Sequence, residues 1–240
     1  TRFKLMELSD LNAPIFKRML SQAPGTYTHS ISVANLAESA CEAIGANALL
    51  ARVSAYYHDI GKVDQADYFV ENQKAFNRHD ELRPSLSAAV IKSHVRIGIE
   101  KAQELKLPQA IIDIIAQHHG RGLITFFYHR AMKEGKNIGV SRDDYSYPGV
   151  RPKTKEAAVL MLADTVEAAS RSLKHPTEAR LEQFVQEMIM EKLTSGELGD
   201  SNLTLRDLEL IRRSFVHILE GYFHTRIEYP KIARARGGKL

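Results

Sequence analysis

His58 and Asp59 place an imidazole directly beside a carboxylate, within the mostly apolar stretch 55–62. Burying both groups without partners would cost several kcal/mol, and a metal ion would supply the missing partner. The dipeptide alone is weak evidence, because a second His-Asp pair, His79 and Asp80, reads as a loop or helix-start pair. The rest of the chain must therefore show whether further metal ligands accompany the first pair.

Further imidazole and carboxylate side chains lie in or at the edge of apolar, helix-like segments. They are His29, His94, His118, His119 and Asp164. With the first pair they make five histidines and two aspartates, more than one ion usually needs. Two ions roughly 3.5–4 Å apart that share a carboxylate can bind a bridging hydroxide and clamp a phosphoryl group for in-line attack. The set therefore favours a two-metal hydrolase.

Asp164 lies in the middle of residues 156–169, which are apolar nearly all round. Such a helix is usually central and buried, and an ionised carboxylate is tolerated there only if it is paired or metal-bound. Taken alone, His94 is more simply interpreted as a core histidine. It becomes a candidate metal ligand only when it is considered together with the other candidate residues. Histidines at positions 79, 129, 175, 217 and 224 lack such a setting, and we interpret them as surface or capping residues.

The elements that must position these side chains are predicted to be helical almost throughout, because apolar residues recur at three- and four-residue spacing. We therefore expect an all-α fold. Helices are predicted around residues 29–40, 49–57, 86–105, 108–115, 156–169, 181–193 and 205–223. Gly45 is expected to end the first of them, and Thr204 with Asp207 resembles a capping box before the last.

The segment 134–155 is irregular and contains several Gly and Pro residues. A loop this long inside a compact domain is often functional. It ends in Arg151, Lys153 and Lys155, just before the helix of Asp164. The loop therefore holds candidate phosphate contacts beside a candidate metal ligand.

The bulk composition is that of an ordinary soluble globular protein of 240 residues, enough for one domain with or without an appendage. We find no signal peptide and no apolar run of membrane-spanning length, and we expect the chain to be a fragment of something longer. The single Cys41 excludes an internal disulfide and suits a reducing compartment. A net charge of +4 slightly favours an anionic ligand but does not mark a nucleic-acid binder.

The order His, His-Asp, His, His-His, Asp resembles the dinuclear form of the HD-domain superfamily of metal-dependent phosphohydrolases. Longer motifs closely resemble the cytosolic catalytic domain of the seven-transmembrane HD receptors, whose best-known members are the PgpH-type cyclic di-AMP phosphodiesterases. These motifs are 25–30, 35–38, 43–47, 56–62 and 68–73. The resemblance covers most of residues 15–230 and is specific, because several long motifs fall in the right order.

The resemblance implies a single HD-domain helical bundle over residues 15–230, with a dinuclear metal site in its core. An N-terminal linker segment, 1–14, would precede it, and a basic flexible tail, 231–240, would follow. The implied activity is hydrolysis of cyclic di-AMP to linear pApA by attack of a metal-bridging hydroxide. The implied cofactors are two divalent transition-metal ions, iron or manganese.

Residue by residue, the resemblance implies that His29, His58, Asp59 and Asp164 hold one ion. Asp59 would bridge to a second ion, held by His94, His118 and His119, and would act in catalysis together with Lys62. Lys62 would approach the phosphate or the leaving oxygen, although a solvated lysine after a helix end would look the same in sequence.

The other candidate substrate contacts are Tyr147, Arg151, Lys155 and Arg171. Arg171 lies close to two helical turns after Asp164 and so can face the same pocket. Tyr147 could stack on adenine or belong to the core, and the two other cations could equally form an ordinary charged loop. In the related cyclic di-GMP branch, His-His-Glu and Gly-Tyr-Pro stand where this chain has 118–120 and 147–149, which disfavours guanine.

Two other functions remain open from the sequence: a metal-dependent cyclic-dinucleotide sensor without turnover, and a (p)ppGpp or nucleotide phosphohydrolase on the same fold. We expect a small-molecule cyclic dinucleotide as the partner and no DNA or RNA polymer. The resemblance implies a cytoplasmic domain, without membrane insertion of its own, in a membrane-anchored bacterial parent. The sequence leaves the oligomeric state open, including a dimer.

Overall fold

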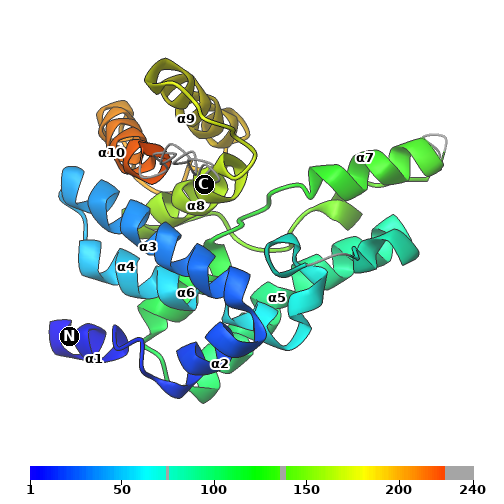
Figure 1. Cartoon of the computed structure of the whole chain (residues 1–240), viewed down its shortest axis with the longest axis horizontal. Helices are drawn as coiled ribbons and strands as arrows, with labels where there is room; N and C mark the ends of the chain where they lie inside the picture. The colour runs from blue at the N-terminus through cyan, green and yellow to red at the C-terminus, as the bar shows by residue number, and fades with distance from the viewer. Residues whose placement is uncertain (74–75, 136–138, 225–240) are drawn as a thin grey trace, which may run out of the picture.

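The computed structural model describes residues 1–73, 76–135 and 139–224. Within these ranges there is no β-strand, only an isolated bridge between Leu123 and Ser146, so the all-α prediction is confirmed. The α-helices (Figure 1) are α1 (Arg2–Leu8), α2 (Pro14–Gln22), α3 (Pro24–Ala43), α4 (Ala48–Tyr57), α5 (Pro84–Glu104), α6 (Gln109–Gln117), α7 (Thr125–Glu134), α8 (Lys155–Ser170), α9 (Glu178–Thr194) and α10 (Leu205–His224). The 3-10 helices are η1 (Ile60–Tyr68), η2 (Val70–Asn72), η3 (Arg78–Glu81) and η4 (Asp143–Tyr145).

Helices α3 and α8 form the centre of the main bundle. Helix α3 packs against α2, α4, α8 and α10, while α8 also contacts α4, α6 and α9. Residues 157–163 of α8 are all buried, which confirms the prediction from its sequence. Cys41 on α3 is buried in the same core. Because residues 157–164 of α8 are buried, a polar side chain among them must find its partner inside the protein.

The helix ends follow local sequence signals. Helix α3 stops at Ala43, two residues before Gly45, which adopts φ = +69°. At the start of α10, Thr204 N donates to Asp207 Oδ2 at 3.0 Å and Asp207 N donates to Thr204 Oγ1 at 3.0 Å, so the predicted capping box is confirmed. These ends fix where α3 and α10 enter the bundle.

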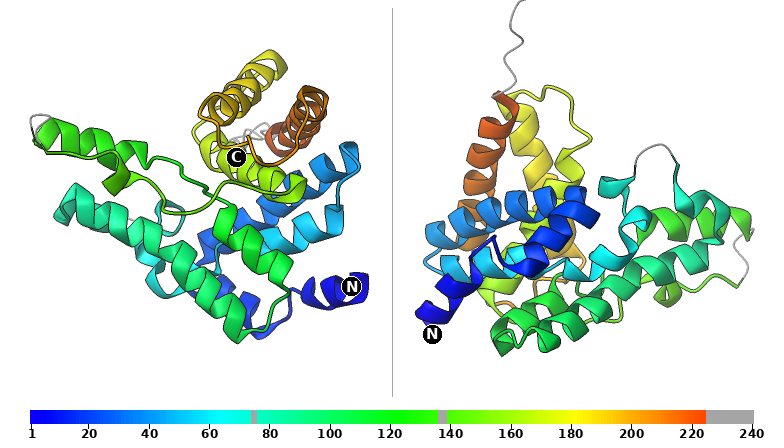
Figure 2. Two further views of the ribbon diagram at one scale, coloured as in Figure 1. Left: turned by 180° about the vertical axis from the view of Figure 1, so that it is seen from behind. Right: turned by 60° about the horizontal axis from the view of Figure 1, so that its bottom comes forward.

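A second, smaller apolar cluster lies away from the main bundle, where α7 runs beside α5 (Figure 1, and from two other sides in Figure 2). It consists of Ala88, Phe127, Ala131 and Tyr145. Lys92 Nζ on α5 donates to the carbonyl of Asp144 at 2.6 Å, next to this cluster. The predicted loop is thereby tied to α5 at Asp144.

The N-terminal segment 1–14 contains α1, which packs against α4. Tyr57 Oη donates to the carbonyl of Leu8 at 3.1 Å, and Leu5, Leu8 and Leu11 contact the main core. Among the helices of the described ranges, none is both long and apolar enough to cross a membrane. The predicted basic tail, 231–240, lies outside the described residues.

Candidate metal centre and adjoining cleft

The seven predicted metal-ligating residues come from distant parts of the chain and meet in the core. His29 lies on α3, His94 on α5 and Asp164 on α8. The other four follow helix ends: His58 and Asp59 come directly after α4, and His118 and His119 directly after α6. Six of the seven are buried, and the His119 side chain is 24% exposed. The fold therefore brings the whole predicted set together.

Three of the imidazoles are oriented by their own backbone. Nδ1 of His58 lies 2.7 Å from the carbonyl of Ala55, and His94 and His118 make the equivalent contact with the residue three positions earlier, at 2.6 and 2.7 Å. A carbonyl can only accept, so Nδ1 carries the proton in each ring. The Nε2 atoms therefore face the centre of the cluster, as metal ligands require.

Asp59 lies between two groups of potential ligands. Its Oδ2 is 3.2 Å from Nε2 of His58, whereas its Oδ1 is 3.4 Å from Nε2 of His94. The first group is His29, His58 and Asp164, and the second is His94, His118 and His119; in each, one ligand atom per residue lies within 4.8 Å of the others. Each oxygen of Asp59 thus faces a different group, which is the arrangement of a bridging carboxylate.

Electrostatics fit the same interpretation. Burial lowers the pKa of His94 to about 4 and, helped by the neighbouring His58, that of His118 to about 3, so these rings are neutral at pH 7. Burial alone would raise the pKa of Asp59, but His58 and Lys62 hold it well below its usual range. Burial opposes the charge of His58, but Asp59 and Asp164 raise its pKa to about 10, so this ring holds a proton that a bound cation would displace. The neutral rings of His94 and His118 and the charge of the carboxylates are the properties of a cation site.

Several polar atoms in the cluster lack partners. His58 Nε2 and both carboxylate oxygens of Asp59 are buried without a hydrogen bond. Lys62 Nζ lies 2.6 Å from Asp59 Oδ2, close enough for an ion pair but outside hydrogen-bond geometry. Buried polar atoms are rarely left unsatisfied, and a divalent metal ion would satisfy these. The chemistry of the donor set therefore fits divalent metal binding.

Glu167 is a buried carboxylate that we did not identify from the sequence. Its Oε2 accepts a hydrogen bond from His29 Nδ1, while Nε2 of the same ring lies 2.9 Å from Asp164 Oδ1. Glu167 also accepts from Arg171, with Nη2 to Oε1 at 2.9 Å. A carboxylate behind a ligating histidine fixes its tautomer and orientation. A glutamate in an otherwise apolar helix is the sequence feature from which Glu167 could have been predicted.

Lys62 points into the cleft beside the cluster and is held by a second buried carboxylate, Glu71. Its Nζ donates to Glu71 Oε1 at 3.0 Å, and Thr26 Oγ1 donates to the same oxygen at 3.1 Å. Burial opposes the charge of Lys62, but Asp59 and Glu71 raise its pKa, so the ammonium stays protonated. Asn72 Oδ1 accepts from the backbone N–H of Gly25 at 2.9 Å, so the motifs at 25–30 and 68–73 meet here.

The glycine shortly after the His-Asp pair, Gly61, is required by close backbone packing. A Cβ at this position would lie 1.9 Å from the carbonyl oxygen of His94 and 2.6 Å from the backbone nitrogen of Gly98. The start of η1 therefore runs directly against the backbone of α5. This close approach brings Asp59 next to His94 and links the two ligand groups.

The predicted substrate contacts divide into three groups. Lys62, Tyr147 and Arg171 line the cleft of about 190 Å³ that opens over the cluster. Arg151 lines a neighbouring cavity instead. Lys155 lines neither, because its ammonium pairs with Asp207 at 2.9 Å beside the start of α10.

Two other predictions concern ring side chains. Tyr147 stacks on His119, with ring centroids 4.3 Å apart and planes 27° apart. His79, which we interpreted as a surface or capping residue, is buried instead, and that interpretation was wrong. Its Nε2 lies 2.7 Å from the carbonyl of Tyr68 and its ring contacts Phe127, so it closes the apolar cluster under α7.

Comparisons with known proteins agree with this geometry. Residues 26–169 match the HD domain family. The cyclic-di-AMP phosphodiesterase PgpH of Bacillus subtilis is 45% identical over 232 residues, which are 96% of this chain and 32% of that protein. The protein of the same name from Listeria monocytogenes is 43% identical over 231 residues, again 96% of this chain and 32% of that protein. The chain thus spans about a third of the length of the curated relatives it matches.

A solved structure is similar over nearly the whole chain. The crystal structure of the Listeria monocytogenes PgpH HD domain in complex with cyclic-di-AMP superimposes with a TM-score of 0.84 at 44% identity. The match covers 90% of this chain and 100% of that one. The fold is therefore the same as that of the crystallised domain.

Proposed function

The chain belongs to the HD domain family, and on that premise we propose that it is a metal-dependent phosphodiesterase that hydrolyses cyclic di-AMP to linear pApA. The observation that carries the proposal is Asp59, whose two oxygens face two separate groups of buried ligands. The relatives named as cyclic-di-AMP phosphodiesterases, and the related domain in complex with cyclic-di-AMP, support the choice of substrate.

We propose two divalent transition-metal ions, iron or manganese, as the cofactors. His29, His58 and Asp164 would hold one and His94, His118 and His119 the other, with Asp59 as a ligand of both; the grouping of the ligand atoms supports this assignment. Imidazole and carboxylate together suit such ions. When bound, they would supply Lewis-acid activation of water and of the phosphoryl group.

Lys62 would neutralise charge on the phosphate during cleavage. Its side chain is 11% exposed, lines the cleft and carries a raised pKa because Asp59 and Glu71 outweigh its burial. A lysine that stays protonated cannot serve as a general base, but it can donate to a phosphate or leaving oxygen. Glu71 would act as a positioning residue, since it holds the ammonium at the edge of the cleft.

The substrate bases would contact the walls of the cleft. One face of the Tyr147 ring is stacked on His119, so the other face is the one that an adenine would use. Arg171 is partly exposed and already paired with Glu167, so it can meet a phosphate without a large movement. Both roles are proposals that follow from the position of these side chains beside the cluster.

The deciding experiment incubates the manganese-loaded domain with cyclic di-AMP and cyclic di-GMP and follows the products by chromatography. We expect conversion of cyclic di-AMP to pApA, and a loss of about a hundredfold or more in Asp59→Asn together with lost metal content. The matched control is Asp67→Asn, because Asp67 lies on η1, which directly follows Asp59, but its side chain is 69% exposed and pairs with Arg78.

Other results would redirect the assignment. Tight binding of cyclic di-AMP without cleavage would favour a sensor. Release of phosphate or pyrophosphate from mononucleotides, with the dinucleotide left intact, would favour a nucleotide phosphohydrolase. An unchanged rate in Asp59→Asn would refute the metal-centred mechanism in either case.

The cellular setting belongs to the same proposal. We propose that the domain acts on the cytoplasmic side of the bacterial membrane, as part of a membrane-anchored parent, on a small-molecule substrate rather than on a DNA or RNA polymer. The resemblance of the motifs at 25–30, 56–62 and 68–73 to the seven-transmembrane HD receptors supports this setting. Sedimentation of the purified domain would decide between a monomer and a dimer.

A further inference from the structure

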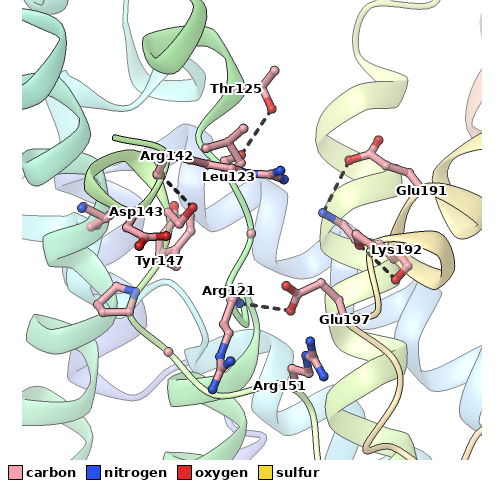
Figure 3. Close-up of a pocket in the computed structure, with 16 residues that line it drawn as sticks. Arg121, Leu123, Thr125, Arg142, Asp143, Tyr147, Arg151, Glu191, Lys192 and Glu197 are labelled. Carbon is pink, nitrogen blue, oxygen red and sulfur yellow. Dashed lines mark hydrogen bonds and ion pairs between the residues drawn. The ribbon is translucent and has the colours of Figure 1, made fainter. Parts of the chain in front are cut away.

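A second cavity (Figure 3), larger than the metal cleft, shares the side chain of Tyr147 with it. Its volume is about 710 Å³, against about 190 Å³ for the cleft. The connection between α6 and α7, the loop 142–151 and the C-terminal end of α9 surround it. This volume is within the range of small-molecule sites, roughly 300–1,000 Å³.

Positive charge predominates among the side chains that line this cavity. Five are cationic and three are carboxylates. They are Lys92, Arg121, Arg142, Arg151 and Lys192, and Asp143, Glu191 and Glu197. A concave surface with a net positive lining attracts anions.

Three arginines of the cavity have guanidinium groups without a hydrogen-bond or ion-pair partner among the described residues. Arg151 Nε is buried and makes no hydrogen bond. No hydrogen bond or ion pair among the described residues engages the guanidinium groups of Arg121 and Arg142 either. A buried, unsatisfied guanidinium nitrogen carries a desolvation penalty that an external acceptor would remove. The fork of donors on arginine is suited to phosphate oxygens.

The carboxylates of the cavity are not placed to satisfy these arginines. Glu197 Oε2 accepts from the backbone N–H of Arg121 at 3.0 Å, and Glu191 reaches only Lys192, at 3.9 Å, with its own side chain 62% exposed. Figure 3 shows Arg121, Arg151 and Glu197 gathered at one end of the cavity. The guanidinium groups there are therefore available to a ligand.

The cavity is built on a backbone that has little freedom to collapse. A Cβ at Gly149 would lie 2.6 Å from the carbonyl oxygen of Gly120, and a Cβ at Gly120 would lie 2.1 Å from Glu197 Oε2. The loop 142–151 is thus pressed against the end of α6. Leu123 and Pro148 also line the cavity and offer apolar surface on which a planar ring can pack.

We propose that this cavity is a second ligand site, separate from the metal cleft, for a nucleotide with terminal phosphate groups. The phosphates would lie against Arg121, Arg151 and Lys192, and the base against Leu123 and Pro148. Tyr147 lines both spaces, whereas none of the seven candidate metal ligands lines this cavity, so a ligand here would lie beside the ring that stacks on His119 without reaching the metal ligands.

The test is calorimetric titration of the whole domain in EDTA, with ADP, inorganic pyrophosphate and adenosine as probes. We expect ADP to bind most tightly and adenosine most weakly. Arg151→Gln and Arg121→Gln should each weaken ADP binding about tenfold or more, the loss of one charge-assisted hydrogen bond. The matched control is Arg96→Gln, because Arg96 is exposed and pairs with Glu100 outside the cavity.

A separate variant distinguishes this site from the metal centre. Asp59→Asn should leave ADP binding unchanged, since the cavity does not include Asp59. The proposal is overturned if no probe binds, if Asp59→Asn abolishes binding while the arginine variants retain it, or if cyclic di-AMP displaces ADP from the metal-free domain. The last result would make the cavity an extension of the substrate cleft. Because Arg121 is an exposed side chain, its variant tests the site even if Arg151→Gln fails to fold.

Discussion

Replacing Glu167 by glutamine should weaken one metal site and spare the other. The carboxylate is 7% exposed and accepts from both His29 and Arg171, so its charge is poorly screened by solvent. The amide of glutamine keeps the shape but removes the negative charge behind His29. Loss of such a partner lowers metal affinity about 10–100-fold, or about 1.4–2.8 kcal/mol.

The assay is a manganese titration of the metal-free domain, read by calorimetry so that the two sites can be fitted separately. In Glu167→Gln we expect weaker binding at the group of His29, His58 and Asp164, and unchanged binding at the group of His94, His118 and His119. The matched control is Glu100→Gln, because Glu100 makes an exposed pair with Arg96 and lies outside the centre.

Arg171 allows a further separation of causes. Arg171→Gln removes the ion pair but leaves Glu167 bonded to His29, so metal affinity should fall much less than in Glu167→Gln. If Glu167→Gln bound both ions as tightly as the unaltered domain, or lost both equally, the assignment of Glu167 as a positioning residue for His29 would be refuted.

Three further outcomes are expected. Gly61→Ala should destabilise the metal-free domain by about 1–3 kcal/mol in urea unfolding, because its Cβ would lie 1.9 Å from a backbone oxygen of α5. The control Gly199→Ala should not destabilise it comparably, because its Cβ would lie at an ordinary contact distance, 3.4 Å from the carbonyl oxygen of Gly196. Lys155→Gln should leave KM for cyclic di-AMP unchanged and lower the free energy of unfolding by less than about 1 kcal/mol, because its partly exposed ammonium pairs with Asp207. A raised KM would show that Lys155 does contact the substrate. Burial raises the pKa of the Cys41 thiol to about 12, so the thiol should not react with a thiol reagent at pH 8 until the protein unfolds. The free energy of unfolding should fall above pH 9.0, the pKa of the thiol in the unfolded chain, because the unfolded thiol ionises there and the folded one does not. Rapid labelling of the folded domain would contradict this.

Local sequence patterns predicted most of the fold. Periodic apolar residues identified the helices, and the all-round apolar character of 156–169 identified α8 as central. The capping box at Thr204 and the stop at Gly45 were also readable, because each depends on residues a few positions apart. The same locality explains the orientation of His58, His94 and His118, whose Nδ1 atoms bond within one helical turn.

The candidate metal ligands were found from the sequence because their residue types and order resemble a known family. Neighbouring polar groups with other roles were not found in the same way. Glu71 was quoted only as part of a motif, and Glu167 was passed over, although both are buried carboxylates that hold a functional side chain. Lys155 and Arg151 looked equivalent in the loop, yet the fold turns one toward Asp207 and the other into a cavity.

The sequence by itself determined which segments are helices and which residue types are available for metal chemistry, because both depend on patterns within a few turns of chain. The tertiary structure alone decided which charges meet. Glu167 reaches His29 across 138 positions, and Gly61 lets η1 approach α5 closely enough to bring Asp59 beside His94. Such pairs depend on how helices pack, and side-chain burial and contact distances across the bundle are not encoded in any one segment.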